Sequence, residues 1–269
     1  MHDTLASLVE RALANNPRPL EFYLREHSRL SGSRANTELA NDVSHLLAAS
    51  SSRNPDGVRT LLDYFVSDDR KMAASNTPSE FIVLCGIIAF GTCAAAQPIW
   101  REETYTLLSQ YASCSFWRIR DGVVVAYQRL LIADAHEVIP RLMELATGGN
   151  YLQQSVAIAA VAEAALLYSP EMFTSALELQ RIVLERLHST PTIDRKSENF
   201  RVLRRTLGYT LSVITAAAPE QGFALMRECA SWNDSDVAWI LKENLKKKRL
   251  AKFPQDTEAV SKLLASRSS

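Results

Sequence analysis

The 269-residue sequence is poor in the residues that interrupt regular structure, since it has nine glycines and ten prolines. An all-β protein of this length needs many tight turns, which these two residues favour, so the composition argues against that class. The sequence also lacks an excess of either charge, because 30 Lys and Arg balance 30 Asp and Glu. A zero balance argues against a uniformly basic protein that coats nucleic acid.

The cysteine and histidine residues are scattered, with no CxxC pair and no HExxH motif. The four cysteines are Cys85, Cys93, Cys114 and Cys229. A zinc site needs clustered ligands, so we expect neither a metal nor another cofactor. Cys85 and Cys93 fall inside an apolar helical pattern, and we interpret the cysteines as reduced thiols of the core.

No stretch has the pattern of a targeting or membrane segment. The N-terminal sequence carries Asp3, Glu10 and Arg11 where a signal peptide needs an unbroken apolar core. The longest apolar stretch, 81–96, contains glycines and a threonine and is shorter than a membrane span. We therefore expect no membrane association and a cytoplasmic location.

Familiar catalytic motifs are absent from the sequence. It contains no GxxxxGK[ST] loop, no GxGxxG after a strand, no GxSxG turn and no SxxK with its partner motifs. Catalysis is therefore uncertain, and a binding role is favoured.

What the sequence has throughout is the amphipathic pattern of helices, and no segment shows the sustained alternation of a strand. Asn54 before Pro55 predicts a helix start, with a capping side chain followed by proline at the first helical position. The helices predicted in the first part of the chain are 4–14, 17–29, 38–49, 55–66 and 81–96. Those predicted after it are 100–112, 117–132, 136–146, 152–168, 171–188, 199–217, 220–230, 236–253 and 257–265.

The later helices form pairs that resemble one another. Ile119 aligns with Gln153 in the next pair, and Val237 aligns with Ile119 at about three repeats of roughly 39 residues. A two-helix hairpin cannot bury its apolar faces alone, so stacking would build the core. We predict an all-α fold, a right-handed α-α superhelix, as one solenoid domain over 1–269. Its expected parts are N-terminal capping helices (1–53), hairpin repeats (54–253) and a C-terminal cap (254–269), and the alternative is a non-repetitive bundle.

The segment 136–167 resembles a HEAT repeat. Pro140 stands inside its first helix, where HEAT units often carry a kinking proline, and a turn of small residues leads to a second helix rich in Ala and Val. The helices around Ile119 and Val237 are similar, and residues 27–40 resemble a segment of bacterial HEAT-like proteins. This resemblance implies an armadillo-like α-solenoid that binds proteins, as most HEAT arrays do, or DNA, as a minority do.

A weaker resemblance is to the HEAT-like DNA glycosylases that excise alkylated purines. Trp117 and Asp121 stand four residues apart, as the Trp and Asp of that group do, and Trp239 resembles its second tryptophan. The resemblance implies that the tryptophans contact the damaged nucleoside and that Asp121 is a catalytic carboxylate, stabilising positive charge on the sugar. Where that group has a phosphate-binding arginine one repeat later, this chain has residues 153–155, Gln-Gln-Ser.

Residues 117–121 form the densest group of aromatic and charged side chains, and Trp117, Arg118 and Arg120 are candidate binding residues beside Asp121. A tryptophan one helical turn from a carboxylate can hold a cationic sugar or a positively charged side chain. The alternative is structural. Trp117 would then pack under the preceding helix, and Arg120 with Asp121 would belong to a ladder of ion pairs between repeats.

A second candidate surface lies in the last repeat. Trp239, Lys242, Lys246 and Arg249 are spaced for one face of the helix predicted over 236–253. Such a stripe can bind a phosphate backbone or an acidic peptide, or it can be a solvated basic face at a helix C-terminus. Three further candidates share the preceding predicted helix, namely Arg201, Arg204 and Arg205.

The neutral total hides two opposed parts of the chain. Residues 195–253 hold 12 Lys and Arg against 6 Asp and Glu, so the remainder is acidic by the same amount. Such asymmetry indicates a polarised binding surface. Our leading hypothesis is a HEAT-like scaffold that binds a protein or nucleic-acid partner on a concave, C-terminally basic face, and the alternative is a glycosylase-like protein that excises or binds alkylated purines.

Overall fold

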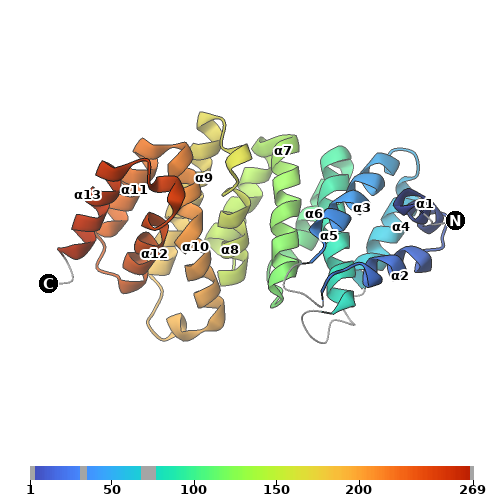
Figure 1. The fold of residues 1–269 in the computed structure, drawn as a ribbon, viewed down its shortest axis with the longest axis horizontal. Coiled ribbons are helices and arrows are strands. Elements are labelled where there is room, and N and C mark those ends of the chain that lie inside the picture. The colour runs from blue at the N-terminus through green and yellow to red at the C-terminus, as the bar shows by residue number, and fades with distance from the viewer. Residues whose placement is uncertain (1–3, 31–34, 68–76, 267–269) are drawn as a thin grey trace. The chain divides into compact units, whose positions relative to one another are not determined.

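A computed structural model describes residues 4–30, 35–67 and 77–266, and every regular element in these ranges is a helix (Figure 1). The all-α prediction is therefore confirmed. The chain divides into two compact units, residues 1–134 and 135–269. Repeat arrays divide readily in this way because each repeat contacts only its neighbours. The division therefore does not test the prediction of a single solenoid domain, which stays a prediction.

The N-terminal unit contains six α-helices and the first part of a seventh among its described residues. Capping side chains set several of the starts, and Asn54 caps α4 ahead of Pro55, as predicted, by accepting a hydrogen bond from the Gly57 N–H. The elements are α1 (Leu5–Leu13), α2 (Arg18–Glu26), α3 (Thr37–Ser50), α4 (Pro55–Val66), α5 (Pro78–Ala96), η2 (Pro98–Trp100), α6 (Arg101–Tyr111) and α7 (Trp117–Gly148).

Helix α5 forms the core of this unit, and nearly all its side chains are buried. It begins at Pro78 with Thr77 as its cap, three residues earlier than the sequence pattern predicts. At 19 residues it is long and apolar enough to cross a membrane, contrary to the expectation from the 81–96 stretch, yet 89% of its apolar window is buried inside the protein. Helices α2, α3, α4 and α6 pack around it.

Helices α5 and α7 approach each other closely because glycine stands where they meet. A Cβ atom at Gly91 of α5 would lie 2.6 Å from the Cα atom of Ala126, and one at Gly122 of α7 would lie 2.6 Å from Cδ1 of Leu84. The helix spacing therefore requires glycine at position 91, where the obstacle is the backbone of Ala126, whereas at position 122 the end of the Leu84 side chain would have to move.

The two helices predicted over 117–132 and 136–146 are the two parts of α7, joined at a kink. Asp134 has non-helical dihedrals, φ −161° and ψ 85°, and its carboxylate pairs with Arg101 at 3.2 Å. Pro140 lies inside the second part, where the resemblance to HEAT repeats puts a proline. The boundary between the two units falls at this kink.

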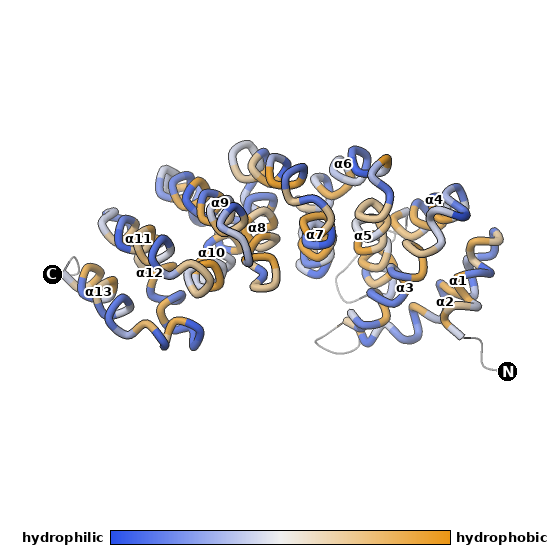
Figure 2. Tube along the Cα trace, turned by 90° about the horizontal axis from the view of Figure 1, so that it is seen from above, coloured by the Kyte–Doolittle hydropathy of each residue, from blue (hydrophilic) through white to orange (hydrophobic). Residues whose placement is uncertain are grey.

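The C-terminal unit stacks its helices in two layers. Helices α8, α10 and α12 form one layer, α9, α11 and α13 form the other, and consecutive helices contact each other across the layers. Apolar and polar residues alternate along these helices, as amphipathic stacking requires (Figure 2). The predicted solenoid of stacked helical pairs is confirmed here. The elements are α8 (Tyr151–Ala160), η3 (Ala164–Leu166), α9 (Pro170–His188), η4 (Asp194–Lys196), α10 (Glu198–Ala217), α11 (Pro219–Ala230), α12 (Ser235–Leu245), η5 (Lys248–Leu250) and α13 (Pro254–Ala265).

Two predicted helices in this unit are too long. The one predicted over 152–168 ends at Ala160, because Glu163 adopts an extended conformation and its side chain caps η3. The one predicted over 236–253 ends at Leu245, since the lysines after it offer no apolar side chain to the core. The buried Leu250 packs inward from the short turn of η5 instead.

Buried amides join the layers of the C-terminal unit. The side chain of Asn244 accepts a hydrogen bond from the Ser212 N–H at 2.8 Å and donates to the Leu207 carbonyl at 2.8 Å, which ties α12 to α10. Gln180 of α9 donates to the Ile158 carbonyl of α8 and accepts from the Thr210 hydroxyl of α10. Satisfied polar groups of this kind fix the alignment of packed helices.

Replacing Gly91 with alanine is expected to destabilise the protein by about 1 to 3 kcal/mol, because the new methyl group meets the backbone of Ala126 and forces the helices apart. The matched control is Gly148→Ala. No atom lies within 4 Å of a Cβ there, so a change between zero and a gain of about 1 kcal/mol is expected. Urea denaturation followed by circular dichroism measures the free energy of unfolding of each variant. Equal changes in the two variants would contradict the close approach of α5 and α7.

Candidate functional site

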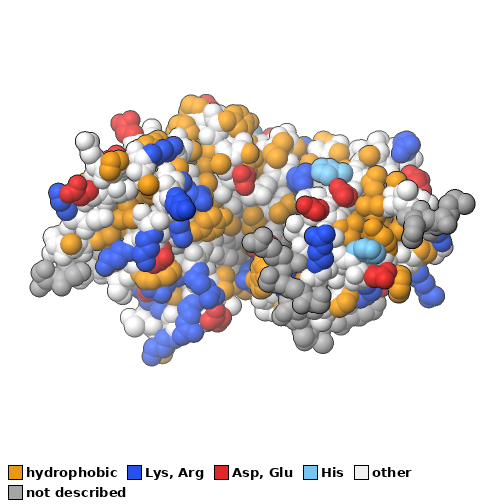
Figure 3. All heavy atoms as spheres, in the orientation of Figure 1, with side chains coloured by type: hydrophobic (Ala, Val, Ile, Leu, Met, Phe, Trp, Pro, Cys, Tyr) orange, Lys and Arg blue, Asp and Glu red, His pale blue; other side chains and the backbone are white. Residues whose placement is uncertain are grey.

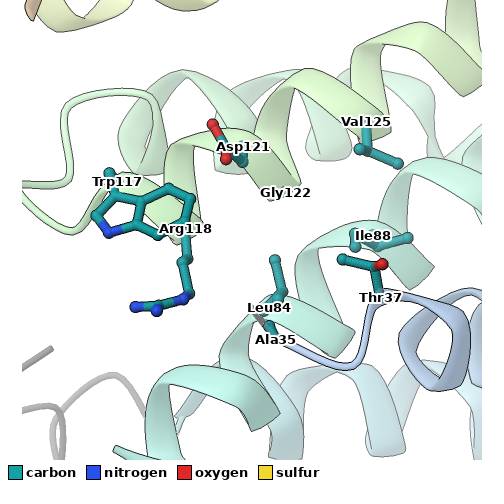
Figure 4. A pocket seen from close by; sticks show the side chains of 9 residues that line it. All are labelled: Ala35, Thr37, Leu84, Ile88, Trp117, Arg118, Asp121, Gly122 and Val125. Carbon is teal, nitrogen blue, oxygen red and sulfur yellow. The ribbon is translucent and has the colours of Figure 1, made fainter. Parts of the chain in front are cut away.

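A pocket of about 310 Å³ opens between α5 and α7 in the N-terminal unit, and we call it the Trp117 pocket (Figure 4). Trp117, Asp121 and Val125 lie one turn apart along its α7 wall, which confirms that the predicted tryptophan and carboxylate share a helix face. Leu84 and Ile88 of α5 form the opposite wall. Its remaining lining residues are Ala35, Thr37, Arg118 and Gly122.

The indole of Trp117 is half exposed at 48% and does not pack under the preceding helix. The Arg118 guanidinium lies 4.4 Å from its ring centroid. Arg118 is itself buried and pairs with the fully buried carboxylate of Glu80 at 3.6 Å. The guanidinium therefore holds the tryptophan in place and is not presented at the surface for a partner.

Arg120 is also buried, and its role is local. Its guanidinium donates hydrogen bonds to the carbonyl oxygens of Cys114 at 2.6 Å and Ser115 at 3.0 Å. These bonds fasten the turn that precedes α7. The structure therefore gives Arg120 a role in holding the start of α7, the helix that carries Trp117.

Asp121 is solvent-exposed, but its environment disfavours the charged form. Loss of water against the apolar walls raises the pKa of Asp121 to about 6, although the charges of Arg120 and Arg118 act to lower it. The carboxylate is therefore ionised at pH 7 and largely protonated at pH 5. A group of this kind can bind a positive charge or a hydrogen-bond donor.

A second pocket, of about 440 Å³, lies in the C-terminal unit, and we call it the C-terminal pocket. It brings together three of the predicted binding residues, Arg204 of α10 and Trp239 and Lys242 of α12. Its other lining residues are Ala230, Trp232, Asn233, Asp234, Ser235, Ala238 and Leu264. Trp232 is not among the residues predicted from the sequence, and its only local signal is its place in the turn before the capping aspartate of α12.

A network of charges holds two lining residues of the C-terminal pocket, Asp234 and Arg204, in place. Asp234 caps α12 and pairs with Arg195 at 2.8 Å and with His188 at 3.1 Å. Asp236 pairs with Arg195 at 3.0 Å and with Arg204 at 2.8 Å. Burial acts to raise the pKa of Asp234, but the hydrogen bonds from Arg195, the Val237 N–H and His188 together hold that pKa below its usual value.

The predicted basic stripe of the last repeat is broken in the structure. Because α12 ends at Leu245, Lys246 is only its C-terminal cap and Arg249 lies in η5, so the four residues do not share a helix face. Lys246 pairs with Glu243 at 2.5 Å. Arg201 and Arg205 are also committed to ion pairs, both with Glu198 of their own helix.

The residues suggested by the glycosylase resemblance lie in different units. Trp117 and Asp121 belong to the N-terminal unit, whereas Trp239 belongs to the C-terminal unit. The ring of Trp239 packs against Gly208, where a Cβ would lie 3.1 Å from it, and beneath the Arg204 guanidinium at 3.9 Å. Trp239 therefore has a clear structural role in joining α10 and α12.

Residues 153–155, which stand where the glycosylase group has its phosphate-binding arginine, form local hydrogen bonds. Gln153 completes a capping box with Asn150 at the start of α8. The amide of Gln154 donates to the Gly149 carbonyl at 2.7 Å, and the Ser155 hydroxyl donates to the Leu152 carbonyl at 2.7 Å. These three side chains supply no positive charge for a phosphate.

Three of the four cysteines are buried in the core, as the sequence predicts. Cys85, Cys93 and Cys229 are buried free thiols and Cys114 is half-buried, all without a disulfide. Burial raises the pKa of the Cys93 and Cys229 thiols to about 12, so both remain protonated at neutral pH. Within the described ranges, no three His, Cys, Asp or Glu side chains gather as metal ligands.

Comparisons with solved structures show similarity to engineered proteins. A designed armadillo repeat protein is 14% identical, with a TM-score of 0.39, over 97% of this chain and 100% of that one. A second engineered protein, known from its crystal structure, is 14% identical with a TM-score of 0.38, over 91% of this chain and 98% of that one. With TM-scores this low, neither likeness bears on function. No family model and no curated protein matches the sequence.

The raised pKa of Asp121 predicts a pH-dependent effect of Asp121→Asn. Above pH 6 the folded protein holds a carboxylate that its surroundings disfavour, and this cost fades as the pH falls and the group protonates. The variant should therefore melt at a higher temperature than the wild type at pH 8, with a smaller difference at pH 5. Asp42→Asn, on the exposed surface of α3, is the matched control, and a lower melting temperature for Asp121→Asn at pH 8 would contradict this account.

Proposed function

We propose that this chain is a helical-repeat scaffold that binds an anionic macromolecule, a protein or a nucleic acid, through a basic segment of its C-terminal unit. The carrying observation is the composition of residues 242–252, with six Lys and Arg and one acidic residue, Glu243. We call this range the basic segment. A stack of helical pairs offers an extended surface to a partner, which suits a binding role.

The charges of the basic segment are mostly free of intramolecular pairing. Lys242, Lys247, Lys248 and Arg249 form no ion pair with any described residue, whereas Lys246 is paired with Glu243. Lysine and arginine side chains gather over α10 and α12 on the face shown in Figure 3. Unpaired cations that follow one another along the chain attract a polyanion and steer its approach. The placement of the partner on a concave face stays a prediction.

Binding should depend steeply on salt and on the basic segment. The affinity is measured by fluorescence anisotropy with labelled polyglutamate and labelled oligothymidylate, between about 50 and about 200 mM salt. For the oligothymidylate, the triple substitution Lys247→Ala, Lys248→Ala and Arg249→Ala should lower the slope of log affinity against log salt by about 0.7 for each phosphate that the variant no longer neutralises. No salt-dependent binding of either probe would contradict the proposal.

The control for this experiment removes the same charge elsewhere. Arg18→Ala, Arg53→Ala and Arg186→Ala together delete three exposed arginines outside the basic segment. This variant should keep the wild-type salt slope if the segment is the site. An equal loss of affinity in both triple variants would show that only the total charge matters.

A second candidate function is the excision of alkylated purines, favoured by the observation that Trp117 and Asp121 line one pocket. It predicts release of base from N-methylated duplex DNA by the wild type, with loss of release in Asp121→Asn. Chromatography of the released bases measures the reaction. Release no greater than in buffer alone would contradict this function, and the binding proposal would be unaffected.

A further inference from the structure

The C-terminal pocket has planar groups along its walls, held in fixed positions. The half-buried Trp232 ring stacks on His188, with ring centroids 5.2 Å apart and 27° between the planes. The Arg204 guanidinium lies 3.9 Å from the Trp239 ring, and its ion pair with Asp236 fixes its direction. Because each plane is supported by a neighbour, little side-chain freedom would be lost when a flat ligand stacks there.

The charge of the pocket suits an anion, although two carboxylates stand beside it. Asp234 and Asp236 are matched by Arg195 and Arg204, so these four residues contribute no net charge. Lys242 lines the same pocket without an ion pair to any described residue, which leaves the pocket positive. The basic segment then continues this charge along the chain from Lys242.

Flat walls beside free cations distinguish between the two kinds of anionic partner. The Asp and Glu side chains of an acidic peptide can pair with the cations, but they carry no ring to stack against Trp232 or Arg204. A nucleic acid supplies phosphates for the cations and bases that stack on aromatic rings and on guanidinium planes. Bases in a duplex are paired and stacked, and turning one outward costs free energy, so an unpaired strand places a base in a pocket more readily.

We propose that the C-terminal pocket binds a base of single-stranded nucleic acid, with the adjoining phosphates lying on Lys242 and the rest of the basic segment. The pocket volume of about 440 Å³ falls within the range of small-molecule sites, about 300 to 1,000 Å³. The inference rests on the proposed function and deepens it, because it names the class of anion and the place where the base is held.

The test compares the affinity of the protein for three labelled probes: an oligothymidylate, a duplex of equal length and a polyglutamate of matched charge. Trp232→Leu should weaken binding of the single strand about 5- to 150-fold, the effect of removing one stacked base, and leave polyglutamate binding unchanged. Addition of the single strand should also quench tryptophan fluorescence in the wild type and less in this variant. Lys242→Gln, on the exposed face of α12, should weaken binding of the strand without disturbing the fold.

Trp100→Leu is the matched control, because it removes a half-buried tryptophan of η2 that lines neither pocket, and it should leave binding of the strand unchanged. Thermal melting of each variant separates loss of binding from loss of the fold. Equal affinity for polyglutamate and the strand, unchanged in Trp232→Leu, would overturn this inference and keep the proposed function. Tighter binding of the duplex than of the strand would also overturn it, and binding of neither anion would overturn both proposals.

Discussion

The fold depends on the need of each helix to bury its apolar face against its neighbours. In the N-terminal unit this need is greatest for α5, which is apolar around its whole circumference and must be covered on all sides. Glycine at positions 91 and 122 lets α7 approach it closely. Gly122 also lines the Trp117 pocket, and because it has no side chain it leaves space there. The pocket therefore lies beside the place where the two helices pack closely.

The C-terminal unit meets the same need in a different way, through α10 at the centre of one layer. Its neighbours α8 and α12 pack on either side, and the buried amide of Asn244 bonds to the backbone of α10. A buried polar side chain is stable only with its partners, so these bonds tolerate one alignment of the helices. That alignment brings Arg204 of α10 beside Trp239 and Lys242 of α12, which makes the C-terminal pocket.

The two pockets differ in how their charges are used. Around the Trp117 pocket, Arg118 is paired with a buried glutamate and Arg120 is bonded to backbone carbonyls, so both cations hold structure in place. In the C-terminal pocket, the pairs formed by Asp234 and Asp236 are balanced, and the lysine beside them has no such task. Free charge is what a distant polyanion responds to, and this difference favours the C-terminal unit as the binding site.

The sequence by itself determined the all-α class, the positions of most helices, the capped start of α4, the buried thiols and the concentration of positive charge after residue 195. These are properties of contiguous residues, since a helix and its cap are formed by neighbours in the chain. The length of α12 was overestimated from the sequence. The pattern shows where charged residues stand, but it does not show whether a helix at those positions can pack against the core. Only the tertiary structure decided that Arg204 and Trp232 meet Lys242 across one pocket, that Arg118 is buried against Glu80, and that Asp121 has a raised pKa. Each of these results from side chains that lie far apart in the chain and meet only when the helices stack, and no local pattern encodes such a meeting.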